Sequence, residues 1–343
     1  TGKVKKESRA KGGFEIDGEK LEIISSLKTE LPIDLSKKEL SLQLTTLLDH
    51  RALSLRHPKI QAIFKIYSIL LQSYADAMQD EGFTEIKTPK ILEAASEGGG
   101  NFFKIQYFDR EAFLAQSPQF YKQIMVGVFE RVFEIGPVFR AEPHFTTRHV
   151  NEYISLDAEM GFIEDEKDVM KMLNRILVKM WNDLQEKSKP FLELYEIKLN
   201  EVPEEIPAIK LSEMKKLIHQ KYGYEIPEDT DIDPEGERFA GKWAKEEQGS
   251  DFVFLTNYPR AYRPFYTMPL AKDSDESRGF DLLFKGLEIV TGSQRIHLYD
   301  DLIENMKRKK VKPDGMEFYL NTFKYAMPPH GGWALGIERL IQQ

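Results

Sequence analysis

Cysteine is absent from this sequence of 343 residues. Its absence excludes disulfide scaffolds, cysteine nucleophiles, iron–sulfur clusters and thiolate zinc sites. Any metal must therefore bind through carboxylates, histidines or hydroxyls, and an oxygen-rich site of this kind would suit Mg²⁺. Long apolar runs are missing as well: none approaches the roughly 18 residues of a membrane-spanning helix, and the first residues lack the apolar core of a signal peptide. We expect a cytoplasmic protein with no membrane segment.

Excess positive charge is also lacking. The 48 lysines and arginines are outnumbered by 56 aspartates and glutamates, which gives a net charge of −8. This balance argues against a protein that coats nucleic acids nonspecifically, but it permits a local basic face. With 41% hydrophobic and 30% charged residues, the composition is that of a globular protein. The length allows one large domain or two smaller ones.

The chain begins with two predicted strands, residues 2–7 and 14–25, on either side of a basic, glycine-rich turn. So short a piece cannot bury a core by itself. It therefore either packs on the residues that follow or ends a small β domain. Residues 31–43 resemble a hinge.

Two amphipathic helices are predicted from apolar residues at helical spacing. The first runs from residue 59 to 79, with Gly82 placed to end it, and the second covers residues 169–184. The stretch 189–250, rich in proline and glutamate, has the character of a loosely specified insertion. Hairpins and helices in this order predict an α+β fold around a largely antiparallel sheet.

The segments VFEIGPVFRAE and ISLDAEMGF carry charge on one face of a predicted hairpin. Arg140 and Glu142 share a face of the first strand. In the second strand a polar face opposes an apolar one; the polar face is Ser155, Asp157 and Glu159, and the apolar face is Ile154, Leu156, Ala158, Met160 and Phe162. In the long connecting segment, Arg148 and His149 could close on an anion. The alternative is a half-exposed hairpin whose charged face is solvated.

A further hairpin is predicted in FDLLFKGLEIVTGSQR. If Phe284 and Lys285 form its turn, Asp281 and Glu288 face each other across the two strands. Facing carboxylates repel unless a cation lies between them, and Mg²⁺ is the candidate, with Thr291 as a hydroxyl ligand. The alternative is a register shifted by one residue, which would leave the two acids on opposite faces.

Ser117 and Pro118 have the pattern of a helix start, with serine as N-cap and proline at the first helical position. Gln119 and Lys122 then share one helix face. The positive end of the helix and the lysine ammonium would together bind a small carboxylate. The alternative is an ordinary surface helix with a solvated lysine.

The segment PPHGGWALGIERL predicts a glycine-rich strand, where a ligand could approach the backbone, and then a helix whose first turn carries Arg339. Residues 98–100 are a glycine run that would form a flexible loop. The basic run 307–312 is interpreted as a solvated helix end, with tRNA contact as the less favoured alternative. Of seven histidines only His149 and His330 adjoin other candidate groups, and no pair has metal-ligand spacing.

Three of these segments resemble the signature motifs of class II aminoacyl-tRNA synthetases, in the subclass of the aspartyl, asparaginyl and lysyl enzymes. GFTEIKTPKI, with Pro89, is similar to motif 1, FRAEPHFTTRHVNEYISLDAEM to motif 2 and GGWALGIERL to motif 3. The resemblance extends from residue 48 to the last residue and is strongest to the compact aspartyl type of archaea, the eukaryotic cytosol and some bacteria. It implies a class II catalytic domain on a largely antiparallel sheet flanked by helices, and a homodimer formed through motif 1.

The same resemblance divides the chain. Residues 1–26 are similar to the last strands of an OB-fold β-barrel that binds the anticodon, residues 27–50 would be a hinge, and residues 51–343 the catalytic domain. The last residues fall inside the motif 3 helix, so the chain resembles one truncated at this end.

For ATP, the resemblance implies that Arg140 binds the α-phosphate and that Glu142 contacts the adenine edge or the incoming tRNA terminus. Tyr153 and Arg339 would sandwich the adenine ring, a role that suits a guanidinium. The outer phosphates would be held by Arg148 and His149. Mg²⁺ would be bound by Asp281 and Glu288, with Thr291 at the position of a family serine.

For the amino acid, the resemblance implies that Lys122 and Arg295 bind the side-chain carboxylate of aspartate. Asp157 and Glu97 would bind its α-ammonium, Ser117 and Gln119 would complete the pocket, and the loop 98–100 would close over it. A buried lysine ammonium favours aspartate over neutral asparagine by several kcal/mol. Asparaginyl enzymes usually lack lysine here.

The implied reaction is aspartate–tRNA ligation. ATP activates L-aspartate to aspartyl-adenylate, which is transferred to the 3'-terminal adenosine of tRNA-Asp, and positioning and fixed positive charge provide the catalysis. Two alternatives within the class are an enzyme that also charges tRNA-Asn and an asparaginyl enzyme. From a different class, the chain could be a catalytically silent paralogue that binds tRNA or a protein partner, although its intact ATP and metal residues argue against this.

Overall fold

The computed structural model describes residues 1–10, 12–93, 102–143, 150–228 and 230–343. They form two compact units, Thr1–Gln61 and Ala62–Gln343. The elements of the smaller unit are β1 (Gly2–Lys6), β2 (Phe14–Gly18), α1 (Leu44–Asp49) and α2 (Arg51–Ser54). β1 and β2 pair as an antiparallel hairpin, and β2 is shorter than predicted because β1 offers partners only as far as Gly18, opposite Gly2.

The larger unit contains most of the strands. They are β3 (Thr84–Glu85), β4 (Ile91–Leu92), β5 (Lys104–Tyr107), β6 (Arg110–Leu114), β7 (Arg131–Phe139), β8 (Glu152–Gly161), β9 (Ala208–Lys210), β10 (Phe252–Thr256), β11 (Gly279–Phe284), β12 (Leu287–Arg295) and β13 (His330–Gly336). Eight of them form one sheet in the order β3-β7-β8-β13-β12-β11-β10-β9, and β4-β6-β5 form another. In the large sheet only the edge pairs β3–β7 and β9–β10 are parallel. The expected α+β fold on a largely antiparallel sheet is confirmed.

The remaining elements are helical. They are α3 (Pro58–Asp80), α4 (Gln119–Phe129), α5 (Glu166–Lys187), α6 (Lys189–Leu194), α7 (Leu211–Tyr222), α8 (Pro234–Gln248), η1 (Arg260–Tyr262), α9 (Tyr299–Arg308), α10 (Glu317–Lys324) and α11 (Ile337–Gln342). Helices α3 and α5 confirm the two amphipathic predictions. The Asp165 carboxylate caps α5 by accepting from the Lys167 amide at 2.9 Å. No described helix is both long and apolar enough to cross a membrane.

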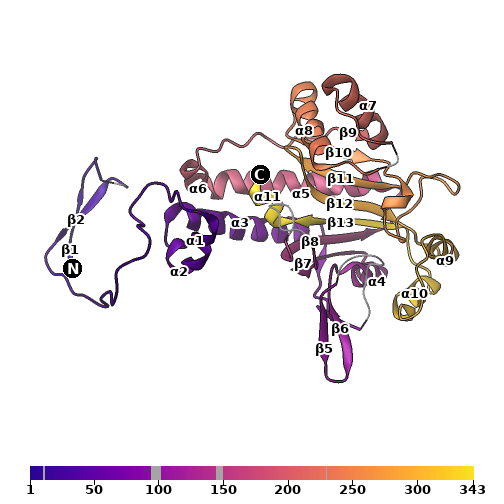
Figure 1. Cartoon of the computed structure of the whole chain (residues 1–343), viewed down its shortest axis with the longest axis horizontal. Coiled ribbons are helices and arrows are strands. Elements are labelled where there is room, and N and C mark those ends of the chain that lie inside the picture. Colours follow the sequence, from indigo (N-terminus) through magenta and orange to yellow (C-terminus); the bar gives the residue numbers. More distant parts are fainter. Residues whose placement is uncertain (11, 94–101, 144–149, 229) are drawn as a thin grey trace. The chain divides into compact units, whose positions relative to one another are not determined.

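Helices α3 and α5 pack on one face of the large sheet (Figure 1). Their buried side chains, such as Tyr74 and Leu173, join Leu156 of β8 and Trp333 of β13 in the main hydrophobic core. On the other face, α7 and α8 pack against β10 and β11 in a smaller cluster, so the segment 189–250 is anchored to the sheet by a core that it shares with these strands. Helices α4, α9 and α10 share a third cluster. Because side chains alternate along a strand, β8, β12 and β13 turn their polar residues away from α3 and α5.

Candidate active site

The polar face of β8 is buried. Ser155, Asp157 and Glu159 are 4%, 2% and 0% exposed, so the interpretation as a solvated charged face is wrong. The opposite residues Leu156, Ala158 and Met160 enter the main core, as the alternation predicted. Phe162 does not, because it lies beyond the strand with a positive φ of 60° and is 70% exposed.

A cavity of about 300 Å³ collects most of the predicted site residues. Those that line it are Ser117, Gln119, Lys122, Arg140, Glu142, Tyr153, Glu288, Thr291, Arg295 and Arg339. They come from α4 and the residues just before it, the segment after β7, strands β8 and β12, and α11, which are far apart in the sequence. Because β7 ends at Phe139, Arg140 and Glu142 lie beyond the strand, and the prediction that they share a strand face is wrong. Asp157 and Asp281 lie behind the lining residues, bonded to Lys122 and Arg263 respectively.

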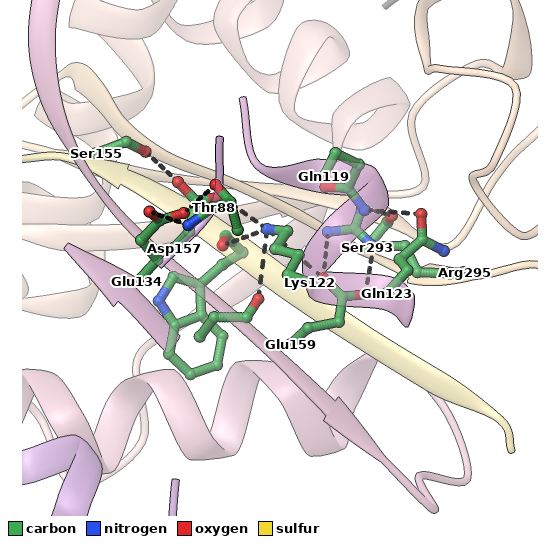
Figure 2. A network of polar contacts seen from close by, with 12 residues as sticks. Thr88, Gln119, Lys122, Gln123, Glu134, Ser155, Asp157, Glu159, Ser293 and Arg295 are labelled. Carbon is green, nitrogen blue, oxygen red and sulfur yellow. Dashed lines mark hydrogen bonds and ion pairs between the residues drawn. The ribbon is translucent and has the colours of Figure 1, made fainter. Parts of the chain in front are cut away.

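Lys122 is held at the base of this cavity by the protein itself. Its ammonium donates to Asp157 Oδ1 and to the Trp333 carbonyl, both at 2.9 Å (Figure 2). Two longer contacts join it to the Ala158 carbonyl at 3.4 Å and to Glu159 Oε2 at 3.5 Å. The side chain is almost fully buried, so the interpretation of α4 as a surface helix with a solvated lysine is wrong.

Arg295 is paired with Glu159 beside Lys122. Its Nε and Nη2 donate to the two carboxylate oxygens at 2.9 and 3.3 Å, and Nη1 donates to Ser293 Oγ at 2.5 Å. Burial works to raise the pKa of Glu159, but the charges of Arg295 and Lys122 outweigh it and hold this pKa below its usual value. The base of the cavity thus contains two cations and two carboxylates in mutual contact (Figure 2).

The start of α4 differs slightly from the prediction. The helix begins at Gln119, with Pro118 rather than Ser117 at the N-cap position and no side-chain cap. Ser117 lies one residue before the N-cap and does not cap the helix, and its side chain lines the cavity. Gln119 and Lys122 do share the helix face that borders the cavity.

The turn of the β11–β12 hairpin is Lys285–Gly286 and not Phe284–Lys285. Both turn residues have positive φ, 48° and 79°, as a type I′ turn requires, and glycine meets this requirement more readily than phenylalanine. In the observed register Glu288 pairs with Leu283 and Asp281 pairs with Thr291, so the prediction that Asp281 lies directly opposite Glu288 is wrong.

The two acids nevertheless share one face of the sheet. A β-bulge places one extra residue, Ile289, in β12, so that Glu288 pairs with Leu283 while Thr291 pairs with Asp281. Glu288 and Thr291 therefore point the same way, and Thr291 Oγ1 donates to Glu288 Oε1 at 2.8 Å. The alternative of acids on opposite faces is excluded as well.

Arg263 occupies the position next to Asp281 where the sequence predicted a metal. It donates to both carboxylate oxygens, at 2.9 and 2.7 Å, and stacks on Tyr258 with 3.7 Å between the guanidinium carbon and the ring centre. Burial raises the pKa of Asp281 despite Arg263, and the charge of Glu288 adds to this effect. Burial also acts on Glu288, but Arg339 and the Thr291 hydroxyl lower its pKa below the usual value.

The donor chemistry fits Mg²⁺ only in part. Glu288 and Thr291 offer oxygens that line the cavity, which is what this ion prefers. Asp281 could bind it only by exchanging its contacts with Arg263. Within the described ranges no three acidic or histidine side chains form a ready metal cluster.

Tyr153 lies at the other end of the cavity, which Arg140 and Arg339 also line. The Arg140 guanidinium carbon is 5.7 Å from the centre of its ring. Arg339 donates to the Glu288 carbonyl at 3.0 Å and lies 3.3 Å from the Glu288 carboxylate. Burial raises the pKa of Tyr153 although both arginine charges act against it, so this ring stays a neutral, flat surface.

The glycines of β13 mainly allow other protein segments, rather than a ligand, to pack closely against the strand. A Cβ on Gly332 would lie 2.0 Å from the Ala158 carbonyl oxygen and 2.3 Å from Glu159 Oε2. This glycine therefore lets β8 and the Glu159 carboxylate approach. Only Gly336 borders the cavity with room beside it, 3.8 Å from the Tyr153 ring.

Some predicted residues lie outside the described part of the chain: Glu97, the glycines 98–100, Arg148 and His149. Three residues of the site, Arg263, Glu159 and Glu338, had no functional role in the prediction from sequence. Arg263 sits in an irregular segment without periodicity, whereas Glu159 follows Asp157 by two residues and the alternation already placed it on the same face. Glu338 accepts from the Ile154 amide and the Tyr67 hydroxyl, both at 3.1 Å, and so ties α11 to β8 and α3.

Known proteins share this architecture. The family model for tRNA synthetases class II (D, K and N) matches residues 43–343. The chain is 48% identical over 99% of its length to an aspartate–tRNA(Asp/Asn) ligase of Deinococcus radiodurans, covering 79% of that protein, and 46% identical over 98% of its length to an aspartate–tRNA(Asp) ligase of Pyrococcus abyssi, covering 76%. The crystal structure of asparaginyl-tRNA synthetase from Pyrococcus horikoshii with asparaginyl-adenylate matches with a TM-score of 0.90 at 31% identity, covering 99% of this chain and 77% of that one. The chain therefore belongs to the class II tRNA synthetases (D, K and N).

Proposed function

We propose that this chain is an aspartate–tRNA ligase that activates L-aspartate with ATP and transfers it to the 3'-terminal adenosine of tRNA-Asp. The observation that carries the proposal is the buried pair of cations, Lys122 and Arg295, at the base of the cavity. Relatives at 44–48% identity over nearly the whole chain are aspartate–tRNA ligases, which supports the same substrate.

The amino acid would bind with its side-chain carboxylate toward Lys122 and Arg295. Lys122 can make this contact at little cost. Its contacts to the Ala158 carbonyl and to Glu159 are long and therefore weak, so the ammonium proton that points toward them can turn to the ligand. The α-ammonium would lie near Asp157 and Gln119, with Ser117 completing the pocket, and Glu97 is proposed from the sequence for the same group. The side-chain carboxylate of aspartate would make charge-assisted hydrogen bonds to Lys122 and Arg295, and the neutral carboxamide of asparagine could not replace them with bonds of equal strength.

ATP would bind at the end of the cavity formed by Arg140, Tyr153 and Arg339. The adenine ring would stack between Tyr153 and Arg339, because a guanidinium plane stacks well on an aromatic ring. Arg140 would hold the α-phosphate, Glu142 would contact the adenine edge or the tRNA terminus, and Arg148 and His149 would hold the outer phosphates.

Mg²⁺ bound with the nucleotide would neutralise phosphate charge. Glu288 and Thr291 would hold it. Asp281 would become a further ligand if Arg263 released its hydrogen bonds to the Asp281 carboxylate. The low pKa of Glu288 supports this role, since the carboxylate is ionised at neutral pH and available to a cation.

No side-chain nucleophile is needed for the two steps. An oxygen of the aspartate α-carboxylate attacks the α-phosphorus, the bond to the bridging oxygen breaks, and pyrophosphate leaves from the opposite side. A ribose hydroxyl of the tRNA end then attacks the activated carbonyl, loses its proton, and AMP leaves. The chain contributes positioning and fixed positive charge from Arg140 and Arg339.

Further features of the protein follow from the same proposal. We infer a homodimer formed through motif 1 (residues 82–91), an anticodon-binding remnant in residues 1–26, a hinge in 27–50 and a catalytic domain in 51–343. An enzyme that charges tRNA for protein synthesis would work in the cytoplasm. The main alternative is an enzyme that charges tRNA-Asn as well as tRNA-Asp, because the relatives include aspartate–tRNA(Asp/Asn) ligases as well as aspartate–tRNA(Asp) ligases.

The decisive experiment is ATP–pyrophosphate exchange with aspartate, asparagine and lysine, followed by charging of purified tRNA-Asp and tRNA-Asn. We expect exchange with aspartate alone and charging of tRNA-Asp. Exchange with asparagine but not aspartate would overturn the assignment of Lys122. No exchange with any of the three would favour the silent paralogue.

A further inference from the structure

A fully buried histidine lies behind the cavity and has no part in the reaction proposed above. His330, the first residue of β13, is 0% exposed and pairs across the sheet with Arg295. Its Nδ1 lies 2.8 Å from the Pro328 carbonyl oxygen. A carbonyl oxygen can only accept, so Nδ1 must carry the proton.

The other ring nitrogen is therefore a hydrogen-bond acceptor. Burial lowers the pKa of His330 to about 4, so at neutral pH the ring is uncharged and Nε2 has no proton. The Gln123 carboxamide nitrogen lies 2.9 Å from Nε2 and must be the donor. The tautomer of His330 thus fixes which way the Gln123 amide faces.

The orientation of Gln123 determines that of the next amide. Its oxygen is turned away from His330 and accepts from the Tyr319 hydroxyl at 3.0 Å and from Gln119 Nε2 at 3.1 Å. All three side chains are at most 3% exposed, so solvent does not compete for these bonds. Gln119 lines the cavity, and Figure 2 shows its nitrogen facing Gln123. Its carboxamide oxygen is therefore the acceptor that can face a ligand, while the nitrogen keeps one further N–H.

We propose that His330 is a positioning residue that, through Gln123, holds the Gln119 oxygen toward the α-ammonium of the bound amino acid. This inference rests on the proposed function, because it assumes an amino acid in the cavity. If the relay is removed, Gln119 can turn its NH₂ group toward the ammonium, which would replace an attraction by a repulsion between two donors. The effect should therefore depend on the ammonium and not on the side-chain carboxylate.

The test compares L-aspartate with succinate, which is aspartate without its amino group. Dissociation constants of both are measured by titration calorimetry on the full chain and on His330→Phe, a replacement that keeps a buried ring but removes the acceptor. We expect aspartate to bind about 10-fold or more weakly to the variant and succinate to change by less than about 2-fold. Equal weakening of both ligands, or no weakening of aspartate, would overturn the proposal.

Two further variants separate orientation from general damage. Tyr319→Phe removes a hydrogen bond from the same cluster but leaves His330, Gln123 and Gln119 in order, so aspartate affinity should change by less than about 3-fold.

In the double variant His330→Phe with Gln119→Glu, the carboxylate presents an acceptor in either orientation. Aspartate affinity should therefore recover relative to His330→Phe alone; absence of recovery counts against the relay. If the wild-type chain binds asparagine instead of aspartate, the proposed function fails, and the relay is tested in the same way with asparagine and succinamate.

Discussion

At the residue scale, the cavity is governed by buried ionic groups that already contact one another. Lys122, Asp157, Glu159 and Arg295 are each at most 5% exposed. Removing one member of such a group leaves its partner charged and unpaired, which costs more than the pair itself contributes. Substitutions here consequently affect folding and ligand binding together, and controls must separate the two.

The substitution Lys122→Leu should abolish aspartate activation while ATP binding is retained. Because buried Asp157 loses its cation, the free energy of unfolding should also fall by about 3–5 kcal/mol. Urea denaturation gives the second quantity, and pyrophosphate exchange with nucleotide binding gives the first.

A matched control for this loss of stability is Lys90→Leu. Lys90 lies 3.0 Å from the buried carboxylate of Glu134, and neither residue lines the cavity. This variant should lose stability but keep its affinity for aspartate. Unchanged aspartate kinetics in Lys122→Leu would refute the role of that lysine.

His330 should make stability depend on pH in acid solution. Its pKa is about 4 in the folded protein and about 6.5 when unfolded, so the unfolded chain takes up the proton first. Stability from this group is fully present above pH 6.5 and falls as the pH drops toward 4, by about 3 kcal/mol. The charged and titratable groups that act on His330 are Glu159, Arg295 and His297. A substitution at His330 leaves these three groups in place, so the difference between wild type and variant isolates the titration of His330.

The measurement is the free energy of unfolding at pH 7 and pH 4 for the wild type and for His330→Gln. The wild type should lose about 3 kcal/mol more than the variant over this interval. The same loss in both proteins would mean that His330 is protonated at its ordinary pKa in the folded state.

At the scale of elements, period-two alternation in β8 was sufficient to place Asp157 and Glu159 on the functional face. What alternation could not provide was the exact pairing of β11 with β12. The turn lies one residue later than predicted, at Lys285–Gly286, which pairs Glu288 with Leu283 and keeps it on the face of Asp281. The bulge at Ile289 then brings Thr291, rather than Val290, opposite Asp281. Both effects depend on backbone geometry, which residue types only bias.

Gly332 is the position where the contact between β8 and β13 is closest. In Gly332→Ala the new methyl group would meet the Ala158 carbonyl and the Glu159 carboxylate, so the strands or the carboxylate must move. We expect a loss of stability of about 2–3 kcal/mol and weaker aspartate binding, because Glu159 positions Arg295. Gly336→Ala is the control.

In Gly336→Ala the methyl group would meet only the Tyr153 ring at 3.8 Å, an ordinary contact. Its stability should stay within about 0.5 kcal/mol of the wild type. Thermal unfolding of both variants checks the comparison, and equal losses would show that strand spacing is not the cause.

At the scale of the whole molecule, the fold class and the positions of the main helices could be predicted, because hydrophobic periodicity and three motifs in order agree. The ion pairs Arg263–Asp281 and Arg295–Glu159 could not be predicted, since they join residues 18 and 136 positions apart, respectively. Nothing local in the sequence indicates which charge meets which. Only the packed sheet brings these partners together.

The proposed dimer can be tested at this scale. Motif 1 follows α3 and contains β3, an edge strand of the large sheet, and Phe64 on α3 is 46% exposed. We expect sedimentation at twice the chain mass of 39.8 kDa for the wild type and a shift toward the monomer for Phe64→Glu. Val128→Glu, on α4 and 67% exposed, should leave the assembly unchanged. A wild-type chain that sediments as a monomer would contradict the dimer.

The mutual pairing of Lys122, Asp157, Glu159 and Arg295 also has a thermodynamic consequence. Long charged side chains normally lose considerable rotamer freedom when they grip a ligand, and that lost entropy weakens binding. Here folding has already removed this freedom, before any amino acid arrives. Selection among amino acids can therefore be enthalpic, since a ligand of the wrong charge gains nothing from an adaptable pocket.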